Sequence, residues 1–249
     1  MLALKSNNFN STFRKVVDKG AKQLQKYIEN PNEGNVHDTR TSIRRLETSF
    51  EVLPKKIRTK SQIKKFIKSY KQFFKLNNKT RDHDIIYQKL QPKSSEEINK
   101  ILTKLSDQRK NEVKKLVKKA LTLKKIQAPK ITKKYLRYEK IKKRFEKLTT
   151  SLINCIQQNI PKVRSNPKNI EKLHQLRTDC KKLRYLLELS INGKNDDTVM
   201  QLKKMQDILG TIHDYDITVD FLKKQRQSNE IKEICQELIA ERMKKFQEF

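Results

Sequence analysis

The sequence predicts an all-α protein built from two helical bundles that are related by an internal duplication. Apolar residues recur at helical spacing along nearly the whole chain, and the breaks in this spacing coincide with Pro, Gly and Asn. No segment alternates apolar and polar residues with the β-branched enrichment of a strand, so we expect no strands. Two motifs also recur in the same order in each half of the chain, which indicates a duplication.

Four breaks divide the first half of the chain into five helices. They lie at residues 30–34, at Leu53-Pro54, at Asn77-Asn78 and at residues 91–95. Ser94 or Ser95 is placed to cap the last of these helices. We therefore expect helices over 8–29, 35–53, 60–76, 80–90 and 94–126.

The second half follows Ala128-Pro129 and repeats this organisation. Its breaks lie at Ile160-Pro161, Asn166-Pro167, Asn192-Gly193 and Leu209-Gly210. The predicted helices cover 131–160, 168–191, 197–209, 213–227 and 230–247. Residues 1–249 thus form a single domain made of two repeats, the first over about 8–127 and the second over about 131–249. These are called the first and second halves below.

The charge of the chain narrows its function. With 59 Lys and Arg against 28 Asp and Glu, the net charge is +31, which predicts a polyanionic partner. No apolar run approaches the roughly 18–20 residues of a membrane span. The first ten residues lack the pattern of a secretory signal, so we expect a cytoplasmic protein. Three scattered cysteines and four glycines argue against a disulfide framework, a zinc cluster and a phosphate-binding loop.

One helix of each half carries a histidine and several cations on a single face. His37, Arg40 and Arg44 stand at i, i+3 and i+7, so they share one side of a helix, largely opposite the apolar Ile43 and Leu46. The pattern recurs 137 positions later with His174, Arg177, Lys181 and Arg184. Two such faces, related by an approximate twofold axis, would line one shared groove suited to regularly spaced anionic groups.

A second motif follows in each half. Arg81-Asp82-His83-Asp84 matches His213-Asp214-Tyr215-Asp216 at a separation of 132 positions. Carboxylates are unsuited to contact a polyanion. We therefore assign Arg81, Asp82, Asp84, His213, Asp214 and Asp216 a structural role, orienting cations or capping helices.

A stripe of lysines marks the predicted helix over 60–76. Lys64, Lys68, Lys71 and Lys75 share one face, and of these only Lys71 has a cationic match in the second half, Lys203. Such stripes are often plain solvated surface. The sequence alone leaves open whether this one lines the groove.

The two motifs together resemble the CHAD family, the conserved histidine α-helical domain. The resemblance spans both halves and rests on the His-x-x-Arg segments and on Leu209-Gly210-x-x-His213-Asp214. It implies two helical bundles around a basic channel that binds inorganic polyphosphate. With the lysines added, the expected phosphate contacts are His37, Arg40, Arg44, Arg45, Lys71, Lys75, His174, Arg177, Lys181, Lys182, Arg184 and Lys203. Two positions of the first half depart from the pattern: it has Glu47 where the second copy has Arg184, and Asn78 where the second copy has Gly210.

Other functions fit the sequence less well. A nonspecific nucleic-acid-binding protein suits the charge, and weak nucleic-acid binding is expected in any case, but no reading module is present. A polyphosphatase needs carboxylates to hold magnesium, and the Asp pairs are better explained by structure, so we expect no enzyme, no metal and no cofactor. A peripheral membrane role is weaker still.

The expected location is the cytoplasm, at polyphosphate granules if these exist in the cell. Histidine protonation below pH ~6.5 would tighten polyphosphate binding.

Overall fold

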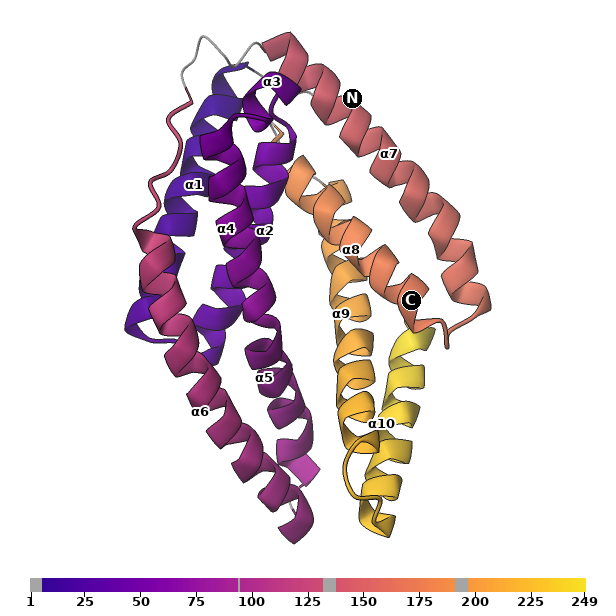
Figure 1. Ribbon diagram of the computed structural model, residues 1–249. Helices are drawn as coiled ribbons and strands as arrows, with labels where there is room; N and C mark the ends of the chain where they lie inside the picture. The colour runs from indigo at the N-terminus through magenta and orange to yellow at the C-terminus, as the bar shows by residue number, and fades with distance from the viewer. Residues whose placement is uncertain (1–5, 94, 132–137, 191–196) are drawn as a thin grey trace.

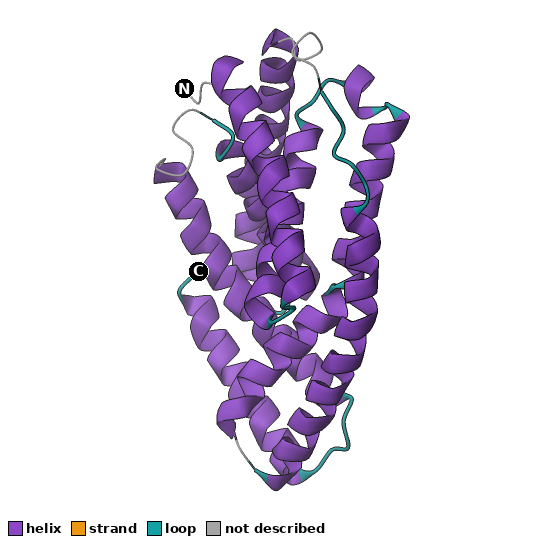
Figure 2. Cartoon of the chain, turned by 90° about the vertical axis from the view of Figure 1, so that its left-hand side faces the viewer, coloured by secondary structure: helices purple, strands orange, loops and turns teal. Residues whose placement is uncertain are grey.

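The structure is a computed structural model that describes residues 6–93, 95–131, 138–190 and 197–249. Within these ranges every regular element is a helix and no strand occurs, which confirms the predicted all-α class (Figures 1 and 2). Most of the helices run along the length of an elongated molecule (Figure 2). None of the described helices is both long enough and apolar enough to cross a membrane.

The first half contains α1 (Ser6–Glu29), α2 (Glu33–Glu51), α3 (Lys55–Arg58), α4 (Ser61–Leu76), α5 (Asn78–Leu90), the 3₁₀ turn η1 (Gln91–Lys93) and α6 (Glu96–Lys124). Side chains cap the helices α2 and α6. Asn32 Oδ1 accepts a hydrogen bond from the backbone N–H of Asn35 at 2.8 Å, and Ser95 Oγ accepts one from Ile98 at 3.1 Å. The short helix α3 follows Pro54 and was not expected.

The second half contains α7 (Tyr138–Ser165), α8 (Ile170–Leu187), α9 (Asp197–Lys223) and α10 (Asn229–Gln247). Asn169 caps α8 and Ser228 caps α10. Each side-chain oxygen accepts a hydrogen bond from the backbone N–H three residues later in the chain, as in the first half. The predicted break at Asn192-Gly193 and the candidate cap Ser94 lie outside the described residues.

Two predicted breaks in the second half are wrong. Helix α9 runs without interruption through Leu209 and Gly210, because glycine inside a helix costs only about 1 kcal/mol relative to alanine and packing outweighs it. Helix α7 likewise continues past Pro161 to Ser165, four residues beyond the ring. The break at Asn77-Asn78, which corresponds to Leu209-Gly210 in the second half, is confirmed, because α4 ends at Leu76 and α5 starts at Asn78.

The two halves share their hydrophobic cores. The larger core joins residues of α1, α2, α4 and α6 to residues of α7, α8 and α9. A smaller core joins α5 and α6 to α9 and α10, through residues such as Leu90, Ile98, Leu222 and Ile231. Helix α2 packs against α8, and α5 packs against α9, so the helices that carry the repeated motifs meet their counterparts (Figure 1).

Candidate functional site

The motif helices bring basic side chains from both halves into one cluster. We call the following residues the central cluster: His37, Arg40 and Arg44 of α2; Arg81 and Asp82 of α5; His174, Arg177 and Lys181 of α8; His213 and Asp214 of α9. Their charges act on one another across the two halves. Lys181 of α8 acts on His37 of α2, and Arg177 of α8 acts on Arg40 of α2, although the two helices are far apart in sequence.

On α2, an aromatic ring orients the two arginines of the cluster. The guanidinium carbon of Arg40 lies 4.1 Å from the centre of the Phe74 ring, and that of Arg44 lies 4.6 Å from the same centre. Arg40 also donates to the backbone oxygen of Phe74 at 3.0 Å and to Asn78 Oδ1 at 2.8 Å. These bonds hold Arg40 in place while its remaining N–H groups stay available to a ligand.

On α8, Arg177 and Lys181 are partly buried beside each other. A Cβ at Gly210 would lie 4.0 Å from Arg177 Nε, so α9 passes close to this guanidinium. That Nε is buried and has no hydrogen-bond partner among the described residues. Burial and the charges of Arg177 and Arg44 lower the pKa of Lys181 to about 7. Burial and Arg44 likewise lower the pKa of Arg40, to about 10.

The histidines of the cluster have lowered pKa values. The rings of His174 and His213 lie with their centroids 5.1 Å apart. Burial and Arg177 lower the pKa of both, that of His213 to about 3, and burial and Arg81 lower the pKa of His37. Lys181 is the cation of the cluster whose lowered pKa, about 7, lies near neutral pH.

Two carboxylates stand among these cations. Burial raises the pKa of Asp82 and of Asp214, and the nearby Arg40 and Arg177 act in the opposite direction. Neither aspartate makes a salt bridge within the described part of the chain, whereas Arg81 pairs with Glu33 at 2.9 Å. The cluster therefore carries more positive than negative charge.

Three of the predicted phosphate contacts form ion pairs with glutamates at the α2–α8 contact. Arg45 donates from Nε to Glu188 at 2.8 Å, and Lys182 lies 2.6 Å from Glu51. Burial alone would lower the pKa of Arg45, but the hydrogen bond and charge of Glu188 outweigh it and raise that pKa. Arg184 lies 3.8 Å from Glu188 as well.

These two cross-half pairs are reciprocal. Arg45 and Lys182 are separated by the same 137 positions as His37 and His174, and so are Glu51 and Glu188. Each half thus offers one cation and one carboxylate from equivalent positions, as in an interface with twofold symmetry. We call Arg45–Glu188 and Lys182–Glu51 the reciprocal ion pairs.

The second aspartate of each Asp-x-Asp motif pairs with an arginine that sequence reasoning missed. Asp84 of α5 binds Arg109 of α6, and Asp216 of α9 binds Arg242 of α10 at 2.6 Å. Each arginine is the only one on its lysine-rich helix, and this was the available signal. Each of these two aspartates thus lies against an arginine, and the orienting role assigned to them stays a prediction.

Three further predicted phosphate contacts are lysines of α4 and α9. Lys71 and Lys75 on α4 and Lys203 on α9 are exposed. Burial raises the pKa of Glu47, and the charges of Lys71 and Arg44 act in the opposite direction.

No group of three or more His, Cys, Asp or Glu side chains in the described ranges is placed to hold a metal ion.

The comparisons with known proteins identify the family. The CHAD domain model matches residues 12–223, most of the chain. The chain belongs to the CHAD family. Among solved structures, the CHAD domain from the plant Ricinus communis is similar with a TM-score of 0.61 and 16% identity, covering 97% of this chain and 87% of that one. PptA from Streptomyces chartreusis is similar with a TM-score of 0.61 and 13% identity, covering 98% of this chain and 95% of that one.

At these identities the two structures support the CHAD fold and nothing more specific. No curated protein matches the chain. The family assignment therefore rests on the domain match and the fold, and the function of this CHAD domain has to be argued from its own residues.

Proposed function

We propose that this CHAD domain binds inorganic polyphosphate in the central cluster. The observation that carries the proposal is the concentration of like charge. Arg40, Arg44, Arg177 and Lys181 come from two helices of different halves and depress one another's protonation or that of their neighbours. Folding has placed these cations together at an energetic cost, and an anionic ligand would offset that cost.

The chemistry of the cluster suits repeated phosphate groups. Arginine presents paired N–H groups to phosphate oxygens, and lysine adds a compact charge. Neutral histidines supply further hydrogen-bond donors without adding to the repulsion. A polymer that meets several such groups at once releases its counterions, as nucleic acids do when they bind basic proteins.

The position of the cluster supports a linear ligand. The reciprocal ion pairs lie near the C-terminal ends of α2 and α8, and the α5–α9 packing lies towards the other end of the molecule. The central cluster takes its residues from both of these helix pairs, α2–α8 and α5–α9. The reciprocal pairs and the repeated Asp–Arg pairs also support our proposal that the chain is an internal duplication around a basic groove.

Binding without catalysis is the activity that we propose. The cluster holds few carboxylates, and those present are flanked by arginines, an unfavourable setting for a catalytic magnesium ion. A role in storage or at polyphosphate granules in the cytoplasm would require no more than this binding. Nucleic acid is the competing ligand, because its backbone offers similar charges at wider spacing.

Calorimetric titration tests the proposal. Polyphosphate of defined length and single-stranded DNA of equal charge are titrated at about 0.15 M salt. We expect saturable binding to polyphosphate with DNA much weaker. Replacing Arg40 and Arg177 by Gln should weaken polyphosphate binding about a hundredfold, since each loses charge-assisted hydrogen bonds.

A matched control separates the cluster from general charge. Arg14→Gln with Arg226→Gln removes the same charge from exposed positions on α1 and after α9. This variant should bind polyphosphate within about threefold of the unaltered protein, because exposed charges are screened. Equal losses in both double variants, or equal affinity for DNA, would contradict the proposal.

A further inference from the structure

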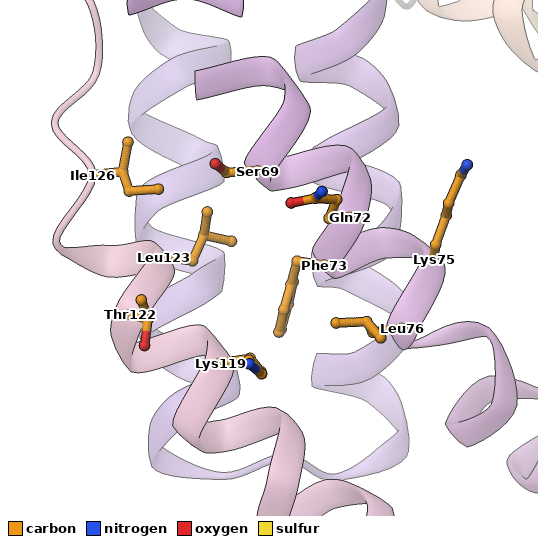
Figure 3. A pocket seen from close by; sticks show the side chains of 9 residues that line it. All are labelled: Ser69, Gln72, Phe73, Lys75, Leu76, Lys119, Thr122, Leu123 and Ile126. Atoms are coloured by element: carbon orange, nitrogen blue, oxygen red, sulfur yellow. The ribbon is translucent and has the colours of Figure 1, made fainter. Parts of the chain in front are cut away.

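A groove between α4 and α6 lies apart from the central cluster and has no role in the proposed function. It has a volume of about 560 Å³, within the range of ligand and peptide sites (Figure 3). Its lining comes from Ser69, Gln72, Phe73, Lys75 and Leu76 of α4, from Lys119, Thr122 and Leu123 of α6, and from Ile126 just after α6. Phe74, the neighbour of the lining residue Phe73, instead contacts Arg40 and Arg44, so the groove and the cluster use different faces of α4.

The floor of the α4–α6 groove is apolar and incompletely covered. Phe73 and Leu123 are buried beneath it, and Ile126 is half-buried. Leu76, however, is 51% exposed, the second most exposed of the large apolar side chains described. An exposed leucine beside a recess of this size marks a surface that a partner can cover.

The rim of the groove is basic and unpaired. Lys65 and Lys68 stand one turn before Ser69 and Gln72, and Lys115 stands one turn before Lys119, so these lysines extend the walls of the groove. All of them are exposed, as is Lys75. None makes a salt bridge in the part of the chain that the structure describes.

We propose that the α4–α6 groove docks an acidic amphipathic helix of a partner protein. Helix-in-groove recognition places apolar side chains at i, i+3, i+4 and i+7 into an apolar recess between two helices. Here Leu76 and Phe73 would receive them. Acidic side chains on the flanks of the partner helix would meet Lys68 and Lys119 on opposite walls.

Charge complementarity favours this occupant over others. A second copy of the chain would bring another +31 charge to the same lysines. A polyphosphate or nucleic acid would satisfy the lysines but leave the apolar floor exposed to water. A flat membrane surface fits a recess between two helices less well than a single helix does.

The test uses a labelled synthetic peptide of about 15 residues, with leucines at helical i, i+3, i+4 and i+7 positions and glutamates elsewhere. Fluorescence anisotropy should show saturable binding. A peptide of the same composition with the leucines scattered around the helix should bind at least about tenfold more weakly, because it cannot fill the groove. Equal binding of both peptides would overturn the proposal.

Matched variants locate the binding surface. Leu76→Glu should weaken binding at least about tenfold, whereas Leu121→Glu should not, since Leu121 is similarly exposed, at 45%, but lies outside the lining. Lys119→Glu should weaken binding about fivefold and the exposed Lys104→Glu less than twofold. Circular dichroism verifies folding. Equal effects within either pair would overturn the proposal.

The inference stands independently of polyphosphate binding. The Arg40→Gln/Arg177→Gln variant should bind the peptide normally, and Leu76→Glu should bind polyphosphate normally. Two further results would overturn the proposal. Binding to phosphatidylglycerol vesicles that depends on Leu76, without peptide binding, would indicate a membrane contact. Dimers in sedimentation that depend on Leu76 would indicate that a second copy of the chain occupies the groove.

Discussion

Polyphosphate binding should be coupled to protonation of one lysine. Lys181 has a pKa of about 7 in the free protein because it is buried beside Arg177 and Arg44. Bound phosphates would favour its charged form and raise this pKa towards its ordinary value or above. Affinity should therefore increase as the pH falls through the alkaline range and level off below pH 7.

The free-state pKa sets the size of the effect. About half of the free molecules carry a neutral Lys181 at pH 7 and about nine-tenths do at pH 8. Binding should take up about 0.9 proton at pH 8 and about 0.1 at pH 6, and affinity should be about tenfold higher at pH 6 than at pH 8.

Calorimetry in buffers of different ionisation enthalpy measures this proton uptake directly. Lys181→Arg is the control, because a guanidinium stays protonated throughout this range. Both proteins receive the same polymer, so the protons taken up by its terminal phosphates cancel in the comparison. The coupling to Lys181 would be refuted if the two proteins took up the same number of protons at pH 8.

Three other substitutions test the framework of the site. Glu188→Gln should lower the free energy of unfolding by about 2–3 kcal/mol in urea titrations, because it leaves the largely buried Arg45 unpaired. Polyphosphate affinity should change less than twofold. A large loss of affinity would instead place Arg45 in the binding site. Asp216→Asn should lower it by about 3–5 kcal/mol, since both side chains of the Asp216–Arg242 pair are under 10% exposed, and a loss below 1 kcal/mol would argue against the pair. Gly210→Ala should raise the melting temperature, because alanine inside the continuous α9 adds up to about 1 kcal/mol to the free energy of unfolding. The new Cβ has room, since the nearest side-chain atom lies 4.0 Å away. A lower melting temperature would contradict this.

Periodicity predicted the parts of this fold that are local. The all-α class and most helix boundaries followed from apolar spacing, from the breaks at Pro, Gly and Asn, and from the capping residue Ser95. The breaks at Pro161 and Gly210 failed because the sequence shows only the local preference, whereas packing along α7 and α9 keeps both helices continuous. The shared face of His37, Arg40 and Arg44 was likewise a property of one helix.

Contacts between distant helices could not be predicted in this way. Arg45 and Lys182 were grouped with the phosphate contacts through the resemblance to the CHAD family, and their glutamate partners on the opposite half could not be read from the sequence. Arg40 was correctly placed on the basic face, yet its dependence on Phe74 is visible only in three dimensions. The lowered pKa of Lys181 depends on the same cross-half approach, because Arg44 and Arg40 of α2 contribute to it.

The reciprocal ion pairs have a consequence for how the chain could be divided. Each half contributes one member to each pair, so recognition between the halves needs no covalent connection through residues 127–131. A protein cut after Gln127 should reassemble from its two fragments, with the surrounding apolar core holding them and the ion pairs selecting the orientation. Exchanging the partners within one pair, as in Arg45→Glu with Glu188→Arg, would give a fragment set that accepts its own complement and rejects the unaltered one.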